Sequence, residues 1–355
     1  MVATKAKLMR TILKVLLLLT ACYGLTMQGQ TKFRVNNTGI SADFTTIAAA
    51  VAAASPNDII IIEHSNVPYG NATIDKRLTI YGTGYFLAEN PNLHADTRSS
   101  KVGTLTFVNG SGPSLISGLE VQTGLIIEED DITVERCRIL ATITIGALGA
   151  VSNTIIQKSF IVHNSAILID AQNALNLNIR NCLLQNNAGI SDFNVKMTVG
   201  SALINHCLLV GVPKCVLKNA TVKNSYFHDC IIDQILSVSH DVEYSASNTN
   251  FINVYGDPSN QDFSLQAFVS NLPDTILSFN QFSSTDEKFK LNPVWPTNRL
   301  KNAGLGGVDI GMYGGAAPYI LSGIPPIPST YFYNGDLNGS PGNGLNVGVK
   351  VKGNK

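Results

Sequence analysis

Four consecutive carboxylates, Glu128, Glu129, Asp130 and Asp131, form the densest group of charged side chains in this sequence. Hard cations such as Ca²⁺ bind several oxygen ligands at once, so these residues are the candidate metal ligands. The run also directly precedes Ile132, which begins an apolar segment, and solvated turn residues are expected at such a place. We favour the turn and expect no metal or other cofactor.

A second group, His228, Asp229 and Asp233, contains the candidate catalytic residues. An imidazole beside a carboxylate is the usual composition of a general acid–base pair. Asp170 and Asp192 could form a carboxylate set with them, but no spacing selects these residues. Whether any of these side chains converge depends on the elements that position them.

Those elements come from a segment that repeats about every 22 residues between residues 132 and 251. Each repeat has an apolar residue, two polar residues, a small residue and, two positions later, a second apolar residue. The first apolar column contains Val134, Ile156, Ile179, Ile204, Val222 and Ala246. The small column contains Cys137, Ser159, Cys182, Cys207, Ser225 and Thr249. The second apolar column contains Ile139, Ile161, Leu184, Leu209, Phe227 and Phe251.

The spacing of these columns predicts a bend inside every repeat. Residues on one face of a strand recur at even spacing, whereas the first apolar and small columns are three positions apart. The two residues between them are polar, and three of the pairs end in asparagine, which tolerates the left-handed backbone conformation. Each repeat is therefore strand, bend, strand and a returning excursion, which stacks into a parallel β-solenoid. His206 lies at a bend position, so we expect it to be structural.

With these columns the chain resembles the right-handed parallel β-helix proteins of the pectate-lyase-like superfold. The resemblance implies an all-β, single-stranded β-helix with an N-terminal capping helix and an extended C-terminal tail. It also implies catalytic signatures that this chain lacks. Pectate lyases use a calcium-binding carboxylate set with an arginine base, and polygalacturonases carry Asn-Thr-Asp, Asp-Asp and Gly-His-Gly. Only Asp130-Asp131 matches one of these fragments.

The six cysteines do not indicate disulfides. Cys137, Cys182 and Cys207 occupy positions that serine or threonine fills in other repeats, as buried free thiols would. The sequence also has no Cys-x-x-Cys or clustered histidines, which makes a zinc-type site unexpected.

The N-terminal residues 1–29 have the pattern of a signal peptide. Basic residues precede the apolar run from Val15 to Ala21, which is too short to span a bilayer. Cleavage before Cys22 would leave a lipidated cysteine, whereas cleavage near Gly29 would leave no anchor. Both outcomes place the protein outside the cytoplasm, secreted or on the outer surface of a bacterial cell.

The rest of the chain divides into the β-helix, 30–315, and a tail, 316–355. The β-helix begins with a cap, 33–86, in which residues 47–54 form a helix. The segment 306–315 resembles the closing strand of secreted bacterial β-helix proteins. The tail combines a proline-rich linker, 318–328, with a final strand, 345–351, that needs a partner.

Three functions remain open. We favour an exported, non-catalytic surface or carbohydrate-contacting module. Its sugar-stacking residues could be Tyr69, Tyr85, Tyr255 and Trp295, although packing in the cap explains these aromatic residues equally well. A polysaccharide lyase or glycoside hydrolase with a divergent site, calcium-dependent if a lyase, is the first alternative. An adhesin or stalk that docks through the C-terminal strand is the second. Lysine plus arginine equals aspartate plus glutamate at 25 each, so nucleic acid is not expected as a partner. We expect a monomer that contacts polysaccharide or a cell-surface protein, and meets the membrane only through a lipid anchor.

Overall fold

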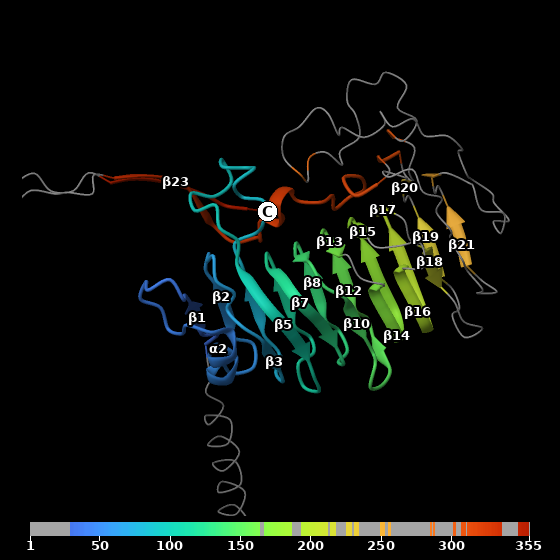
Figure 1. The fold of residues 1–355 in the computed structure, drawn as a ribbon, viewed down its shortest axis with the longest axis horizontal. Coiled ribbons are helices and arrows are strands. Elements are labelled where there is room, and N and C mark those ends of the chain that lie inside the picture. Colours follow the sequence, from blue (N-terminus) through green and yellow to red (C-terminus); the bar gives the residue numbers. More distant parts are fainter. Residues whose placement is uncertain are drawn as a thin grey trace, which may run out of the picture. The chain divides into compact units, whose positions relative to one another are not determined.

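The computed structural model describes residues 29–163, 167–186, 193–211, 214–217, 225–228, 231–233, 249–252, 255–256, 285, 287, 301–302, 307–309, 311–335 and 347–354. Residues Lys32–Lys355 belong to one compact unit. Its strands pair in parallel, level upon level, as the repeat predicts (Figure 1). The chain is thus a right-handed parallel β-helix, and the predicted fold is confirmed.

The strands form three parallel stacks around a common core. Stack 1 contains β1 (Lys32–Val35), β2 (Ile59–Ile62), β4 (Thr79–Tyr81), β6 (Leu115–Ser117), β8 (Thr133–Glu135), β12 (Ile155–Gln157), β14 (Ile167–Arg180), β16 (Phe193–Asn205), β19 (Ser225–His228) and β21 (Thr249–Ile252). Stack 2 contains β5 (Lys101–Phe107), β7 (Glu120–Ile127), β9 (Arg138–Ile139), β13 (Phe160–His163), β15 (Leu183–Asn186), β17 (Leu208–Gly211), β20 (Ile231–Asp233) and β22 (Tyr255–Gly256). Stack 3 contains β3 (Ala72–Ile74), β10 (Ile143–Ile145), β18 (Lys214–Leu217) and parts of β5, β7, β14 and β16 that continue around a corner, while β11 (Val151–Ser152) pairs with β14 beside it.

The predicted bends separate stack 1 from stack 2. The second residue of each bend has a left-handed backbone, with φ of 53° at Arg136, 51° at Lys158, 53° at Asn181 and 48° at His206. We call these four residues the bend column. Arg136, Asn181 and His206 are nearly buried, although a corner residue of a solenoid would ordinarily face solvent. Another segment of the chain therefore covers the corner.

The predicted columns are correct over four repeats and wrong in the next two. Ile179 pairs with Ile156 below it and Ile204 above it, as predicted. Superposition of the internal repeats places Phe227 and Phe251 in the second apolar column. Phe227 instead pairs with Ile204 in stack 1, and Ile232 continues the second column by pairing with Leu209. Phe227 follows Ser225 by two positions, which is the spacing of the small and second apolar columns. The sequence pattern alone therefore could not show that Phe227 belongs to stack 1.

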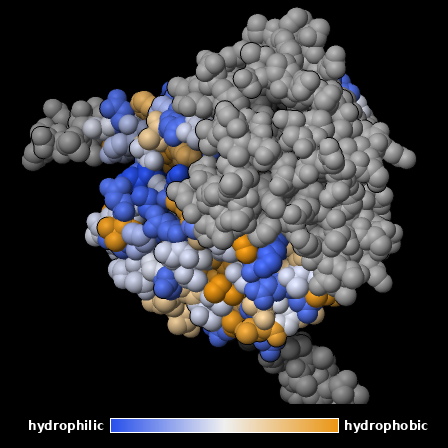
Figure 2. Space-filling view, turned by 45° about the vertical axis from the view of Figure 1, so that its right-hand side comes forward, coloured by the Kyte–Doolittle hydropathy of each residue, from blue (hydrophilic) through white to orange (hydrophobic). Residues whose placement is uncertain are grey.

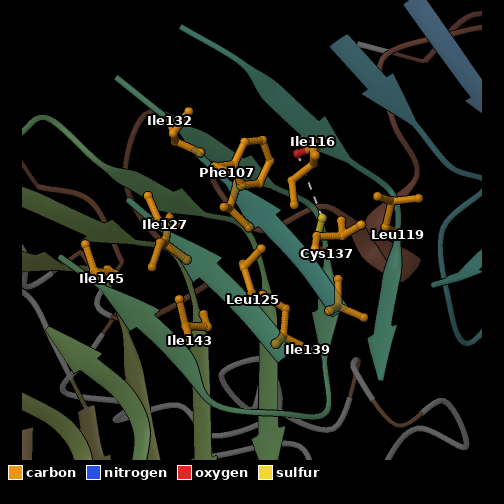
Figure 3. Packing of buried hydrophobic residues seen from close by; sticks show 14 of the residues in the cluster. Phe107, Ile116, Leu119, Leu125, Ile127, Ile132, Cys137, Ile139, Ile143 and Ile145 are labelled. Carbon is orange, nitrogen blue, oxygen red and sulfur yellow. Dashed lines mark hydrogen bonds between the residues drawn. The ribbon is translucent and has the colours of Figure 1, made fainter. Parts of the chain in front are cut away.

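The core is a set of aliphatic ladders with thiols at the small positions (Figure 3). Cys137, Cys182 and Cys207 are buried thiols outside any disulfide, as predicted. The Cys137 thiol lies 3.2 Å from the carbonyl oxygen of Glu135 and 3.8 Å from that of Ile116. Burial raises the pKa of the Cys137 thiol to about 12, so this group stays protonated and unreactive.

The predicted helix lies within the N-terminal cap. Helix α2 (Ile47–Ala53) starts at Thr46, whose hydroxyl accepts a hydrogen bond of 3.3 Å from the backbone N–H of Ala49. Its buried residues, Ile47, Ala50 and Val51, form the apolar side that packs on β1, β2 and β3. The helix thereby covers the first level of the core, which would otherwise be exposed at the open end.

The covering segment over the bend column comes from the C-terminal part of the chain. Arg136 donates to the carbonyl oxygen of Ile324 (2.7 Å), and the Asn181 amide donates to those of Met312 (3.2 Å) and Gly314 (2.8 Å). Residues 311–325, here called the strap, thus follow the corner of the solenoid. The sequence predicts a closing strand in 306–315, but the described residues of this range, 307–309 and 311–315, form bends, turns and irregular backbone and are not part of a strand.

The strap continues through one 3₁₀ turn, Leu321–Gly323, into a hairpin of β23 (Ser329–Gly335) and β24 (Val347–Lys352). β23 is therefore the partner that the last predicted strand needs, in an antiparallel pair. Among the described residues, the structure has no helix long and apolar enough to cross a membrane.

Candidate functional site

The acidic run binds neighbouring turns of its own chain. Its carboxylates accept hydrogen bonds from the backbone N–H groups of Gly110 (2.6 Å), Ala147 (3.1 Å), Leu148 (3.0 Å) and Ser152 (2.6 Å) and from the side chain of Asn153 (3.0 Å). Glu128, Glu129, Asp130 and Asp131 therefore stabilise turns on adjacent levels. Within the described part of the chain, no group of three or more metal-ligating side chains could hold an ion.

Most of the other predicted site residues fall where side chains are not described. Cys22, Asp229 and Asp192 lie outside the described residues. His228 ends β19 and Asp233 ends β20, but only their backbone positions are described. Asp170 accepts a hydrogen bond from Gln172 in β14. His206 holds a left-handed bend and is 7% exposed, which fits the structural role expected for it.

Of the two alternatives for the aromatic residues, sugar stacking and packing, Tyr69 and Tyr85 follow the second. Tyr69 is 1% exposed and Tyr85 is 0% exposed, so neither can stack on a sugar ring. The Tyr85 hydroxyl shares a hydrogen bond of 2.7 Å with the hydroxyl of Tyr319, which fastens the strap to the solenoid. Trp295 lies outside the described residues, and the side chain of Tyr255 is not described.

Hydrophilic and hydrophobic residues form a mosaic on the described part of the face drawn in Figure 2. No broad apolar area dominates the described residues of this face. A cavity of about 400 Å³ lies between the first levels of the solenoid, the excursion before β5 and the strap with its hairpin. Its volume is within the usual range for small-ligand sites.

One wall of the cavity is polar and the other is apolar. The polar wall contains Glu63 and His64 after β2, Thr83 after β4, and His94 and Asp96 from the excursion. The apolar wall is formed mainly by prolines and isoleucines of the C-terminal segment, which are Ile324, Pro325, Ile327 and Pro328. Strands of stack 1 end on one side of the solenoid, and this common edge brings residues far apart in sequence together.

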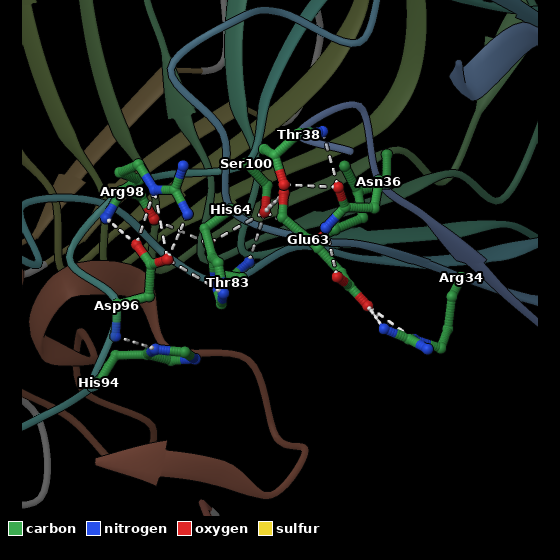
Figure 4. Close-up of polar contacts among 11 residues, drawn as sticks. Arg34, Asn36, Thr38, Glu63, His64, Thr83, His94, Asp96, Arg98 and Ser100 are labelled. Atoms are coloured by element: carbon green, nitrogen blue, oxygen red, sulfur yellow. Dashed lines mark hydrogen bonds and ion pairs between the residues drawn. The ribbon is translucent and has the colours of Figure 1, made fainter. Parts of the chain in front are cut away.

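Asp96 is the centre of the polar wall (Figure 4). Its carboxylate accepts two hydrogen bonds from the Arg98 guanidinium, from Nε (3.0 Å) and Nη2 (2.6 Å). His64 Nε2 lies 3.3 Å from Asp96 Oδ2. Burial would raise the pKa of Asp96, but the hydrogen bonds from Arg98 outweigh it and hold that pKa below its usual value. Asp96 is thus ionised and positions His64.

The two imidazoles have the same tautomer but different partners. Nε2 of His64 lies beside the Asp96 carboxylate, which favours the proton on this nitrogen, and Nδ1 of His64 is buried without a partner among the described residues. Nδ1 of His94 accepts a hydrogen bond of 3.3 Å from the backbone N–H of Asp96, so its Nε2 carries the proton and can donate. The ring centroids are 5.1 Å apart. The cavity wall therefore holds two neighbouring imidazoles, and His94 can offer its Nε2–H as a donor.

Both imidazoles are neutral at neutral pH. Burial lowers the pKa of His64 and of His94 from the usual 6.5, and the attraction of Asp96 offsets only part of that effect. Arg98 further disfavours the charged form of His64, and His64 and Lys352 disfavour that of His94. A drop in pH would therefore place like charges next to each other in the cavity wall.

Acidification is expected to destabilise the fold through these two residues. A folded-state pKa below the unfolded value means that the unfolded chain takes up protons first, so the stabilisation present above pH 6.5 is lost as pH falls through the folded pKa. Urea denaturation at about pH 7.5 and about pH 5.5 should give a lower free energy of unfolding at the lower pH. In the double variant His64→Gln/His94→Gln the difference should shrink; an unchanged difference would assign it to other groups, such as His163, whose pKa burial also lowers.

One feature of the sequence indicates this cavity. His64 follows the segment 59–62, and residues 83–100 follow the strand at 77–82. In a solenoid both segments must leave the same edge, so their polar residues are neighbours despite a separation of about 30 positions. The contribution of the strap could not be foreseen, because nothing in its sequence specifies the solenoid edge on which it lies.

Comparisons with known proteins add little to this geometry. No protein-family model matches the chain, and neither does any curated protein. Among solved structures, a crystal structure of Escherichia coli YbhC is similar, with a TM-score of 0.40 and 12% sequence identity over 65% of this chain and 86% of that chain. Similarity at this level says nothing about activity. The parallel β-helix fold is thus carried by the strand pairing of this chain itself.

Proposed function

We propose that this chain is an exported recognition module that binds a neutral saccharide in the cavity between the solenoid and the strap, and does not cleave it. The observation that carries the proposal is the pair of neighbouring imidazoles, His64 and His94, opposite an apolar wall. A sugar hydroxyl can accept a hydrogen bond from the Nε2–H of His94. The apolar C–H face of a sugar ring can pack on the isoleucines and prolines.

The charges around the cavity favour a neutral ligand. Asp96 is paired with Arg98, and Glu63 accepts hydrogen bonds from Arg34 (2.6 Å) and Asn36 (2.6 Å). Each carboxylate at the cavity thus has its own cation or amide donor. A charged ligand would have to compete with these pairs, whereas a polyol only adds hydrogen bonds to them.

The same pairing argues against cleavage of the saccharide. Glycoside hydrolases use two carboxylates, one on each side of the scissile bond. The two carboxylates at this cavity, Glu63 and Asp96, are instead both engaged with arginine. Neither is free to protonate a leaving group or to attack the sugar, so binding without turnover is the expected behaviour.

Substitution of either histidine is expected to weaken binding. We expect His94→Gln to reduce affinity for a neutral oligosaccharide about tenfold, because one hydrogen bond to the ligand contributes about 1.4 kcal/mol. His64→Gln should reduce it as well, because the His64 ring packs against that of His94. The measurement is a glycan-array screen at neutral pH, followed by titration calorimetry with the best ligand.

His163→Gln is the matched control, since His163 ends β13 and does not line the cavity. It should bind like the unsubstituted chain. Equal affinity of all three variants, or the absence of binding to any glycan, would contradict the proposal.

A polysaccharide lyase or hydrolase is the second candidate, and the His64–Asp96 pair is the observation that favours it. A neutral imidazole held by an ionised carboxylate is the arrangement of a general base. A depolymerisation assay on pectins, alginates and glycosaminoglycans, with and without calcium, separates the two candidates. Product formation by the unsubstituted chain that is lost in His64→Gln would show that the protein is an enzyme and would contradict the proposal of binding without cleavage.

A further inference from the structure

The C-terminal hairpin exposes a row of valines. Val347, Val349 and Val351 alternate along β24 and are 46%, 52% and 59% exposed. Tyr333 of β23, which pairs with Val349, is 59% exposed on the same side. A hairpin of two strands is marginally stable by itself in water, and a third strand with an apolar side stabilises such a sheet. The valines therefore require an explanation beyond the pairing of β23 with β24.

The two outer edges of this hairpin differ. The edge of β23 is attached to the excursion before β5, because the Thr330 carbonyl accepts a hydrogen bond of 2.8 Å from the backbone N–H of Ala95. Backbone hydrogen bonds of β24, in contrast, go to β23 alone within the described part of the chain. β24 is thus an open edge strand, with unpaired N–H and C=O groups available to another strand.

The side chains of β24 separate by face. The valines occupy one face, and Gly348, Lys350 and Lys352 occupy the other. Lys350 lies 5.0 Å above the ring of Phe332, and Lys352 lies 5.8 Å above that of Tyr331. Any strand that joins this edge in register must therefore be apolar on the valine face and must not place a cation opposite the lysines.

We propose that the occupant of this edge is β24 of a second copy of the chain, paired antiparallel about Val349. In that register Val349 lies opposite Val349 of the second copy, and Val347 lies opposite Val351. Lys350 lies opposite Gly348, so no lysines face each other. The strand is self-complementary, which is the requirement of a two-fold interface. The product is a four-stranded sheet with a continuous valine row, and the chain is a dimer rather than the expected monomer.

Registers shifted by one residue, or moved toward the C-terminal end of β24, fail on the same side chains. A shift of one residue places the valines of one copy opposite lysines of the other, because the valine face of one strand then lies on the same side of the sheet as the lysine face of its partner. Pairing about Val351 places Lys350 directly opposite Lys352 of the second copy, and like charges at such positions are destabilising. Lysines on an edge strand ordinarily discourage association, but here a glycine on the other copy leaves room for each Lys350.

Cysteine substitution tests both the dimer and its register. Val349→Cys places two thiols directly opposite each other, so mild oxidation of the full chain should give a disulfide-linked dimer on a non-reducing gel. Val347→Cys should give none, because its two thiols are then separated by roughly 14 Å along the strands. The double variant Val347→Cys/Val351→Cys should cross-link again. Equal cross-linking of both single variants would overturn the register.

Light scattering of the unsubstituted chain provides the second measurement. Its molar mass should rise to twice the chain mass as concentration increases, and Val349→Lys should return it to the monomer by placing two charges at the centre of the interface. Tyr333→Lys adds the same charge to the same face, one strand away from the new seam, and should remain dimeric. A monomer at all concentrations, or equal masses for both lysine variants, would show that the edge stays open. Saccharide binding is measured separately, so either proposal can fail alone.

Discussion

Replacement of Ile179 by aspartate is expected to lower the free energy of unfolding by about 5 kcal/mol, the largest effect of any substitution considered for this chain. Ile179 is 0% exposed and lies in a ladder between Ile156 and Ile204. The variant loses an aliphatic side chain from the core and gains a carboxylate without a cation or hydrogen-bond donor near it. Because whole domains are stable by only about 5 to 15 kcal/mol, much of the protein should be unfolded.

The pH dependence of this loss identifies its cause. A buried carboxylate has a raised pKa, so protonation on acidification should remove part of the penalty for charge. Urea denaturation followed by circular dichroism at two pH values measures both quantities. Leu148→Asp, at a residue that is 89% exposed, is the control and should change stability little. A similar loss in both variants would mean that Ile179 is not in a packed ladder.

The sequence predicted the ladder itself because the chemistry of a solenoid is repetitive. Each level places Ile179 and its counterparts in the same environment, so the same residue type recurs and the period is visible without any structure. The bend was equally visible, since a spacing of three between two buried positions cannot occur on one face of a strand. The left-handed φ at Arg136 and Lys158 shows that position, more than residue type, determines this bend.

The sequence did not predict what happens only once along the chain. The cavity depends on His64, His94 and Asp96, which lie in excursions of different length and follow no period. The strap depends on contacts between residues more than 100 positions apart, such as that of Asn181 with Gly314. The failure at Phe227 has the same origin: once the excursions changed length, two registers satisfied the pattern, and only the strand pairing decided between them.

Asn181 is the residue at which bend and strap meet, and Asn181→Ala is expected to destabilise the fold by about 3 kcal/mol. Alanine in a left-handed conformation is strained by about 1 to 2 kcal/mol, and the backbone carbonyls of Met312 and Gly314 lose a buried donor. Asn181→Gly relieves the strain but still removes the two hydrogen bonds, so it should be less destabilising than alanine. The difference between the two variants measures the strain at φ 53°.

The matched control for the strap is Lys158→Gly, one level below in the bend column. Lys158 has nearly the same φ, 51°, but its side chain pairs with Glu135 (3.4 Å) instead of the strap. Glycine should therefore be neutral or stabilising at 158 and destabilising at 181, although both substitutions make the same change to a left-handed backbone. Limited proteolysis adds a local measurement, in which Asn181→Gly should speed cleavage within 311–325 and Lys158→Gly should not. If both glycine variants were cleaved alike, the strap would be held by its contacts with Arg136 and Tyr85, and the corner at Asn181 would serve the solenoid alone.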